Sequence, residues 1–229
     1  MSRAGLFRSR HGLKALKAGA RLHKVASFLL ADPASQSDAS APTTIRAPVP
    51  GRACGSCTLC CKTVAVQELA KPPGIWCPHC SRSGGCAIYD RRPADCRDFH
   101  CEWMMSKALG PEWKPDRSKF VLMVTPTGHL AACVDPGFPS AWRRAPYFQA
   151  LGQWARERAE NPWSSWPGVD VWIGRRCIII LPDGEKDLGI VAAEEEVRID
   201  RKMTVSGPVY VAEKFTARQA LQRSGCSPS

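Results

Sequence analysis

The sequence predicts an α+β fold in which a loop-rich cysteine module packs on a small antiparallel sheet with helices. Three observations indicate this class: cysteines concentrate in one short segment, strand-like apolar runs occur after residue 118, and two segments show helical spacing. We expect a basic, flexible extension and linker over 1–51 and a cysteine module over 52–109. The α+β remainder over 110–229 is expected to pack with the module as one unit.

The N-terminal extension carries most of the formal net charge of +11, because residues 1–53 hold nine Lys and Arg against two Asp. Leucines at helical spacing with basic residues between them predict an amphipathic helix over about residues 11–30. The Ala-, Ser- and Pro-rich stretch from Asp32 to Gly51 predicts a linker. A transit peptide, a membrane-surface anchor, a nucleic-acid arm and a solvated extension all stay open for the helix.

Hydropathy gives no sign of a membrane protein. No apolar run approaches the ~20 residues that a membrane-spanning helix needs. The apolar piece Val25–Ala31 is short and follows a long charged stretch, which is not typical of a secretory signal. We therefore expect a cytoplasmic protein without a transmembrane segment.

The cysteines are the strongest feature of the sequence, since nine of the twelve lie between positions 54 and 101. These nine are Cys54, Cys57, Cys60, Cys61, Cys77, Cys80, Cys86, Cys96 and Cys101. Disulfides are disfavoured, because the count is odd and the neighbours Cys60 and Cys61 cannot pair with ordinary geometry. A redox pair at residues 77–80 (CPHC) is disfavoured too, because loop residues flank it instead of a strand and a helix.

Metal binding explains the spacing better. A CxxC pair lets two thiolates reach one ion, and CxxCxxC extends this to three, as in iron–sulfur ferredoxin runs. Cys54, Cys57 and Cys60 fit that pattern, so Cys61 faces elsewhere and is available to a second centre. We predict that all nine cysteines are metal ligands, enough for two four-ligand sites with one spare. The predicted cofactor is a zinc ion, iron or an iron–sulfur cluster.

The surroundings of the cysteines agree with a bound metal. Residues 54–101 lack regular apolar periodicity, so a metal would supply folding free energy, of the order of 10 kcal/mol in small zinc modules. His79 and His100 are further candidate ligands. Cations close to the last three cysteines are expected to offset thiolate charge and donate to sulfur. These cations are Arg91, Arg92 and Arg97.

The motif CGSCTLCC at 54–61, followed by CAIYDRRPADCRDFHC at 86–101, resembles the YkgJ-type CxxCxxCC cysteine-cluster family, described as zinc- or iron-chelating. Flagellin N-methylase is a member. The matching positions are Cys54, Cys57, Cys60, Cys61, Cys86, Ile88, Tyr89, Arg92, Pro93, Cys96, Arg97, Phe99 and Cys101. Cys77 and Cys80 supply the middle cysteines, one more than the family pattern needs. The resemblance spans about 48 of 229 residues and implies a chelating domain, not methylation of flagellin.

Two helices are expected from apolar spacing. The first runs over Asp95–Leu109, with Pro93 near its start and Gly110 and Pro111 at its end. The second lies within the range from Pro139 to Arg158. Its apolar face is marked by Phe148, Leu151, Trp154 and Ala155.

Apolar and β-branched runs separated by turn residues predict the strands. They are Lys119–Thr125, His129–Asp135, Val169–Ile173, Cys177–Leu181, Leu188–Ala192 and Val205–Ala212. The first two form a hairpin across the PTG turn. Thr216 and Gln219 have the spacing of a capping box, which predicts a short last helix. The run Glu194–Glu196 is expected to be solvated surface.

Other residues give no catalytic pattern. Cys133, Cys177 and His129 lie in predicted strands and are expected to be ordinary core residues, while Cys226 lies in a polar tail as a free thiol. The eight tryptophans are expected to build the core and roof the cysteine module. There is no Ser/His/Asp arrangement, phosphate-binding loop or informative carboxylate pair, so whether the protein is an enzyme is left open.

Three functions follow from these observations. The first is a metal-chelating cysteine-cluster protein, with the metal ion as its predicted partner. The second is an iron–sulfur oxidoreductase or electron carrier. The third is a zinc-module nucleic-acid binder that uses the basic tail, and the nearly neutral remainder of the chain argues against it.

Overall fold

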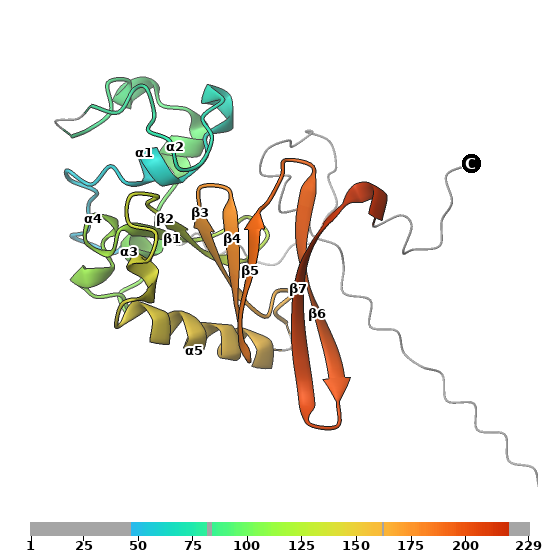
Figure 1. The fold of residues 1–229 in the computed structure, drawn as a ribbon. Helices are drawn as coiled ribbons and strands as arrows, with labels where there is room; N and C mark the ends of the chain where they lie inside the picture. Colours follow the sequence, from blue (N-terminus) through green and yellow to red (C-terminus); the bar gives the residue numbers. More distant parts are fainter. Residues whose placement is uncertain (1–46, 82–83, 162, 220–229) are drawn as a thin grey trace, which may run out of the picture.

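A five-stranded sheet forms the centre of the protein in the computed structural model, which describes residues 47–81, 84–161 and 163–219 (Figure 1). The strand order is β1-β2-β3-β4-β5. Its members are β1 (Phe120–Val124), β2 (Leu130–Val134), β3 (Val169–Ile173), β4 (Arg176–Leu181) and β5 (Gly184–Ile190). Two further strands, β6 (Glu195–Thr204) and β7 (Gly207–Thr216), form a separate antiparallel hairpin. The predicted helix over 11–30 lies outside the described residues.

The sheet is mixed, so the expected purely antiparallel sheet is wrong at one pair. β2 and β3 run parallel, whereas the other neighbouring strands are antiparallel. The reason lies in the connection, because the chain crosses from β2 to β3 through η5 (Ala141–Arg143) and α5 (Tyr147–Glu160). Such a helical crossover returns the chain in its original direction. The predicted hairpin of β1 and β2 is confirmed, with Val121 opposite Cys133.

Helix α5 covers one face of the sheet. Tyr147, Leu151 and Ala155, spaced four residues apart, are buried against strand residues such as Phe120. The predicted apolar face is therefore wrong at Phe148, which is 39% exposed. Tyr147 takes the inward position instead, because its ring packs 5.0 Å from both Trp113 and Phe120, measured between ring centroids.

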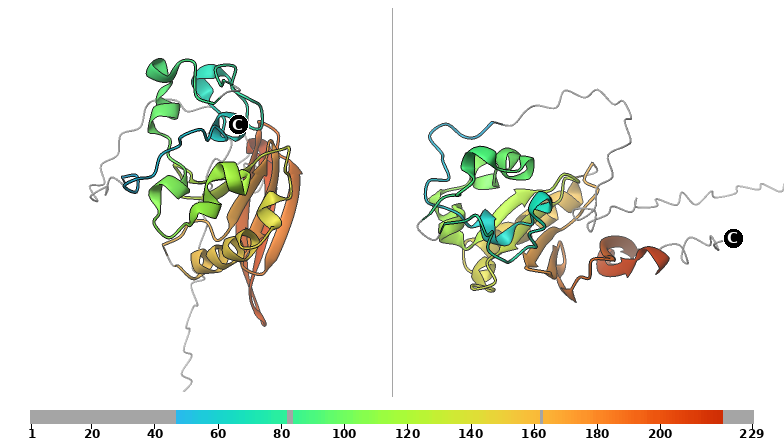
Figure 2. Two further views of the ribbon diagram at one scale, coloured as in Figure 1. Left: turned by 90° about the vertical axis from the view of Figure 1, so that its left-hand side faces the viewer. Right: turned by 90° about the horizontal axis from the view of Figure 1, so that it is seen from above.

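Two different parts of the chain pack on the opposite face of the sheet. The β6–β7 hairpin packs Val197 and Ile199 over Cys177 and Ile179 of β4. The cysteine segment, residues 52–109, packs over β1, where it surrounds Val121. Figure 2 shows this segment gathered at one end of the molecule. Because side chains alternate along a strand, β1 contributes to both the α5 core and the cysteine segment.

Strand β6 was not predicted, and the solvated surface expected at Glu194–Glu196 runs into its start. Its outward side chains are charged: the Arg198 guanidinium donates to the Glu213 carboxylate across the hairpin and lies 3.4 Å from Asp200. Because charged residues alternate with the inward Val197 and Ile199, the segment has no apolar run that would predict a strand. The capping box is confirmed, because the amide of Thr216 donates to the Gln219 side chain at 2.8 Å and the reciprocal bond is 3.4 Å.

Short helices fill the cysteine segment and the residues that join it to β1. They are α1 (Cys60–Thr63), η2 (Gln67–Leu69), η3 (Tyr89–Arg91), α2 (Ala94–Asp98), α3 (Glu102–Met105), η4 (Pro111–Trp113) and α4 (Pro115–Ser118). The single helix predicted over Asp95–Leu109 is wrong, since it is broken between α2 and α3. Phe99 and Cys101 adopt extended backbone there. The break lets residues five positions apart, Cys96 and Cys101, face the same cavity.

The remaining core predictions have mixed outcomes. Cys177 is buried as expected and Cys133 is half-buried. His129 is buried, stacks on Trp166 at 4.1 Å and does not line the cysteine cavity. The expected core role is wrong for Trp76 and Trp163, which are 49% and 92% exposed. Nowhere in the described parts of the chain does a helix have the length and apolar character needed to cross a membrane.

Candidate metal centre

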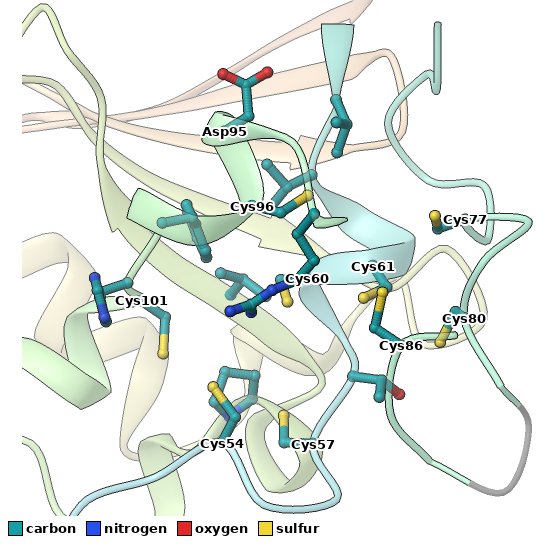
Figure 3. Close-up of a pocket in the computed structure, with 18 of the residues that line it drawn as sticks. Cys54, Cys57, Cys60, Cys61, Cys77, Cys80, Cys86, Asp95, Cys96 and Cys101 are labelled. Carbon is teal, nitrogen blue, oxygen red and sulfur yellow. The ribbon is translucent and has the colours of Figure 1, made fainter. Parts of the chain in front are cut away.

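All nine cysteines predicted as ligands line a single cavity of about 190 Å³ (Figure 3). They come from loops and short helices that are far apart in the sequence. Apolar side chains complete the wall of the cavity and include Val64, Ile88, Met104 and Val121. The sequence therefore anticipated the grouping of these thiols, although their spacing alone did not show how the chain brings them together.

The CxxCxxCC run consists of a turn followed by a helix. Gly55 has a φ of 56°, a backbone conformation that glycine adopts readily, and the amide of Cys57 donates to the Cys54 carbonyl at 3.0 Å. α1 then begins at Cys60. Cys60 and Cys61 are neighbours in this helix, and both line the cavity.

The middle cysteines lie on a turn beside α1. The amide of Cys77 donates to the Cys61 carbonyl at 2.9 Å, and the amide of Cys80 donates to the Cys77 carbonyl at 3.0 Å. Cys80 also forms an isolated antiparallel bridge with Cys86. Residues 77–80 are thus part of a loop, as the flanking sequence predicted, and no helix begins at this described segment.

The last cysteines are positioned by contacts outside their own helices. Glu68 of η2 accepts a hydrogen bond from the amide of Ala94 at 2.9 Å, which fixes the start of α2 and hence Cys96. Arg52 donates to the carbonyls of Ser106 and Leu109, both at 2.7 Å, and to that of Trp103. This arginine ties the chain before Cys54 to the segment that follows Cys101.

The thiols fall into two neighbouring groups. The first contains Cys54, Cys57 and Cys101, and the second contains Cys61, Cys77, Cys80, Cys86 and Cys96. Cys60 lies between them. It is hydrogen-bonded to Cys61 and electrostatically coupled to Cys54 and Cys57.

Burial is the main cause of a raised pKa at four of these thiols. It raises the pKa of Cys57, Cys80 and Cys96, and that of Cys101 to about 11. The physical cause is the loss of hydration of a thiolate in a partly apolar wall. Within the first group, the charge of Cys54 would raise the pKa of Cys101 further.

Cys61 is the exception, because its neighbours lower its pKa to about 6. The largest cause is a hydrogen bond with the Cys60 thiol, which raises the pKa of Cys60 in turn. A hydrogen bond with Cys80 and the positive charges of Lys71 and Arg92 act in the same direction, while burial opposes them. Cys61 is therefore the thiol best suited to carry a negative charge near neutral pH.

Lys71 is a functional candidate that the sequence did not indicate. Its side chain is buried, and its Nζ donates to the carbonyls of Lys62 at 3.2 Å, Pro72 at 3.1 Å and Val64. The ammonium group also interacts electrostatically with the nearby thiols, including Cys61 and Cys77. Nothing in the sequence distinguishes this lysine, because its burial depends on a loop whose ends meet only in the fold.

The predicted cations and histidines have unequal positions. Arg92 lines the cavity, stacks over Tyr89 at 3.7 Å and accepts, at its carbonyl, a hydrogen bond of 2.7 Å from Arg97. Arg91 and Arg97 are exposed and do not line the cavity. His100 lines it, whereas the other predicted histidine, His79, does not.

In the described ranges 47–81, 84–161 and 163–219, no three His, Cys, Asp or Glu side chains are spaced as ligands of one ion. The Cys61 thiol interacts instead with the thiols of Cys60 and Cys80 through hydrogen bonds. Binding of a metal would deprotonate such thiols and replace these hydrogen bonds with metal–sulfur bonds.

Comparison of this chain with family models, curated proteins and solved structures finds no significant match. The resemblance to the YkgJ-type family therefore stays a prediction.

Proposed function

We propose that this protein binds zinc or iron through its clustered cysteine thiolates, with an iron–sulfur cluster as one form of the bound iron. The observation that carries the proposal is the single cavity lined by nine cysteines. Thiolates are the soft ligands that favour zinc and iron–sulfur clusters. The spacing of Cys54, Cys57 and Cys60 and the family resemblance support the same conclusion.

The number of thiols supports more than one ion, or a cluster of several ions. Four thiolates complete the coordination of a structural zinc ion. Nine around one cavity exceed that number, and they already form two groups with Cys60 between them. Bound zinc would hold the cysteine segment together, whereas an iron–sulfur cluster would add the ability to accept and release an electron.

The wall of the cavity suits a negatively charged metal–thiolate centre. Lys71 and Arg92 place positive charge beside the second group of thiols. Val121 and Met104, both buried, limit access of water from the side of the sheet. Charge compensation and a hydrophobic surround are the outer-shell features that support such centres.

Anaerobic purification followed by analysis of zinc, iron and acid-labile sulfide tests the proposal. Zinc without sulfide would identify a thiolate zinc protein, and iron with sulfide would identify an iron–sulfur protein. The second result would favour the electron-carrier function, and bleaching of the brown colour on reduction would support it further. A folded protein that stays free of metal after reconstitution with either metal under reducing conditions would refute metal binding.

A further inference from the structure

The β6–β7 hairpin extends beyond the body of the protein (Figure 1). Each of its strands has ten residues, but burial in β6 ends at Ile199 and burial in β7 begins at Tyr210. We call residues 201–209 the hairpin tip. Eight of these nine residues are exposed and Gly207 is half-exposed. The hairpin tip therefore gains little stability from burial in the core.

The hairpin tip presents aliphatic side chains to solvent. Met203 is 70% exposed, Val209 is 40% exposed and Val205, at the turn, is fully exposed. Apolar side chains that stay exposed remain in unfavourable contact with water and gain nothing from packing. Their occurrence at the most distant point of the fold favours a role in contacting a partner.

The backbone of the hairpin tip is ordered by its own hydrogen bonds. Strand pairing continues to Thr204 opposite Gly207. The Thr204 hydroxyl donates to the Gly207 carbonyl at 2.7 Å and accepts from the Ser206 amide at 3.2 Å. Val205 is thereby fixed in an outward position, so contact with a partner requires little ordering of the chain.

Positive charge borders this aliphatic end. Arg201 and Lys202 are exposed, and the sequence from 201 to 209 contains no acidic residue. Across the part of the chain that the structure describes, neither cation forms an ion pair with another side chain. The neighbouring Asp200 lies beside Arg198 instead. Two basic side chains thus lie next to the exposed aliphatic side chains of the hairpin tip.

We propose that the hairpin tip inserts into the interface of an anionic lipid bilayer. Met203 and Val205 enter the boundary between head groups and acyl chains, and Arg201 and Lys202 contact lipid phosphates. Aliphatic groups gain from leaving water at this depth, and long basic side chains reach back to the head groups. Anionic lipids add an electrostatic attraction for each cation.

The composition and size of the hairpin tip favour a bilayer over other partners. It has no aromatic side chain on which a nucleic-acid base could stack. It offers nine residues, fewer than the roughly 20–30 that each side of a standard protein interface contributes. A bilayer has no such size requirement, because a few aliphatic side chains suffice for reversible partitioning.

Flotation of the full-length protein with lipid vesicles tests the proposal. We expect binding to phosphatidylcholine vesicles that contain about a third phosphatidylglycerol, weaker binding to pure phosphatidylcholine, and a decrease with salt. The double variant Met203→Asp/Val205→Asp should lower the partition coefficient at least about tenfold. Arg201→Ala and Lys202→Ala should each lower it about fivefold on the anionic vesicles.

The control is Ile190→Asp, which places one aspartate on another exposed aliphatic residue, 58% exposed at the end of β5. It should bind as the unchanged protein does, and circular dichroism and thermal melting should show all variants folded. Equal vesicle binding by Met203→Asp/Val205→Asp and the unchanged protein would overturn the proposal, because binding would then reside elsewhere. No binding by the unchanged protein, or a dimer that this double variant abolishes, would overturn it too.

Discussion

The acidity of individual thiols in the cavity depends on their neighbours in space. Cys60 and Cys61 are adjacent in the sequence, yet the pKa of Cys61 falls to about 6 while that of Cys60 rises. The buried Cys101 has a pKa of about 11. A metal that binds these thiols at neutral pH therefore meets a thiolate at Cys61 and a protonated thiol at Cys101.

Metal affinity should consequently increase with pH. Thiols whose pKa lies above the solution pH release a proton on binding, so each adds about one unit of log affinity per pH unit. Between about pH 6.5 and pH 8.5 this slope should come from thiols such as Cys57, Cys96 and Cys101, and not from Cys61, whose pKa of about 6 lies below the range. Competition with a chromophoric chelator across this range measures the slope, and a pH-independent affinity would contradict it.

Replacement of a single lining thiol should lower the amount of bound metal. Cys57→Ser or Cys60→Ser removes a soft ligand from the cavity, and we expect a loss of metal together with greater protease sensitivity over 54–101. Cys133→Ala is the control, because Cys133 packs below the cavity without lining it. Metal analysis by mass spectrometry distinguishes the variants. Full occupancy in both serine variants would remove Cys57 and Cys60 from the ligand set.

Lys71→Met should destabilise the protein and weaken metal binding. The change leaves three carbonyl groups without their common donor and removes the charge beside Cys61. We expect a loss of about 1–3 kcal/mol in the free energy of unfolding, measured by urea denaturation. The exposed Lys107, replaced in the same way, should change this free energy little. Equal effects of the two replacements would show that the buried position of Lys71 has no special importance.

At the level of secondary structure, the sequence indicated the elements that have a continuous local pattern. β1 to β4 follow apolar runs, and their positions are confirmed within one or two residues. β6 was missed because its outward charges break the pattern, and the helix predicted over Asp95–Leu109 is interrupted where Phe99 turns to extended backbone. The parallel pairing of β2 with β3 depends on the path of α5, which no local pattern specifies.

The same distinction applies to the candidate site. The cysteines were identified from their spacing, and all nine line the cavity. Lys71 and Arg52 were not identified, because each acts through carbonyl groups brought near it by the fold. Arg52 binds carbonyls 51 to 57 residues away, and Lys71 binds carbonyls up to nine residues away across a loop, so neither side chain forms part of a sequence motif.

The orientation of α5 gives a prediction for this helix. Leu151→Ala should lower the free energy of unfolding by about 2–5 kcal/mol, because Leu151 is fully buried against the sheet. Phe148→Ala, in the same helix, removes a more exposed ring and should cost about 1 kcal/mol or less. Urea denaturation of the two variants compares them directly. A larger loss of unfolding free energy for Phe148→Ala than for Leu151→Ala would show that Phe148 belongs to the buried face, as the sequence predicts.

For the molecule as a whole, the sheet and the cysteine segment depend on metal to different degrees. The sheet has its own apolar cores on both faces, whereas residues 52–109 are mostly short helices and loops around the cavity. Removal of metal with a chelator under reducing conditions should therefore expose 54–101 to protease while 120–216 stays resistant. Limited proteolysis followed by mass spectrometry maps the cuts. Initial cleavage within the sheet would show that metal stabilises the whole protein as one unit.

The side chain of Val121 closes the base of the cysteine cavity, and it comes from a strand that follows every cysteine of that cavity in the chain. Ribosomes add residues in order, so all nine thiols emerge during translation before the strand on which they pack. For that interval they are open to oxidation and to premature capture of metal. A nascent chain halted after residue 110 would contain every proposed ligand and still lack the surface that shelters them.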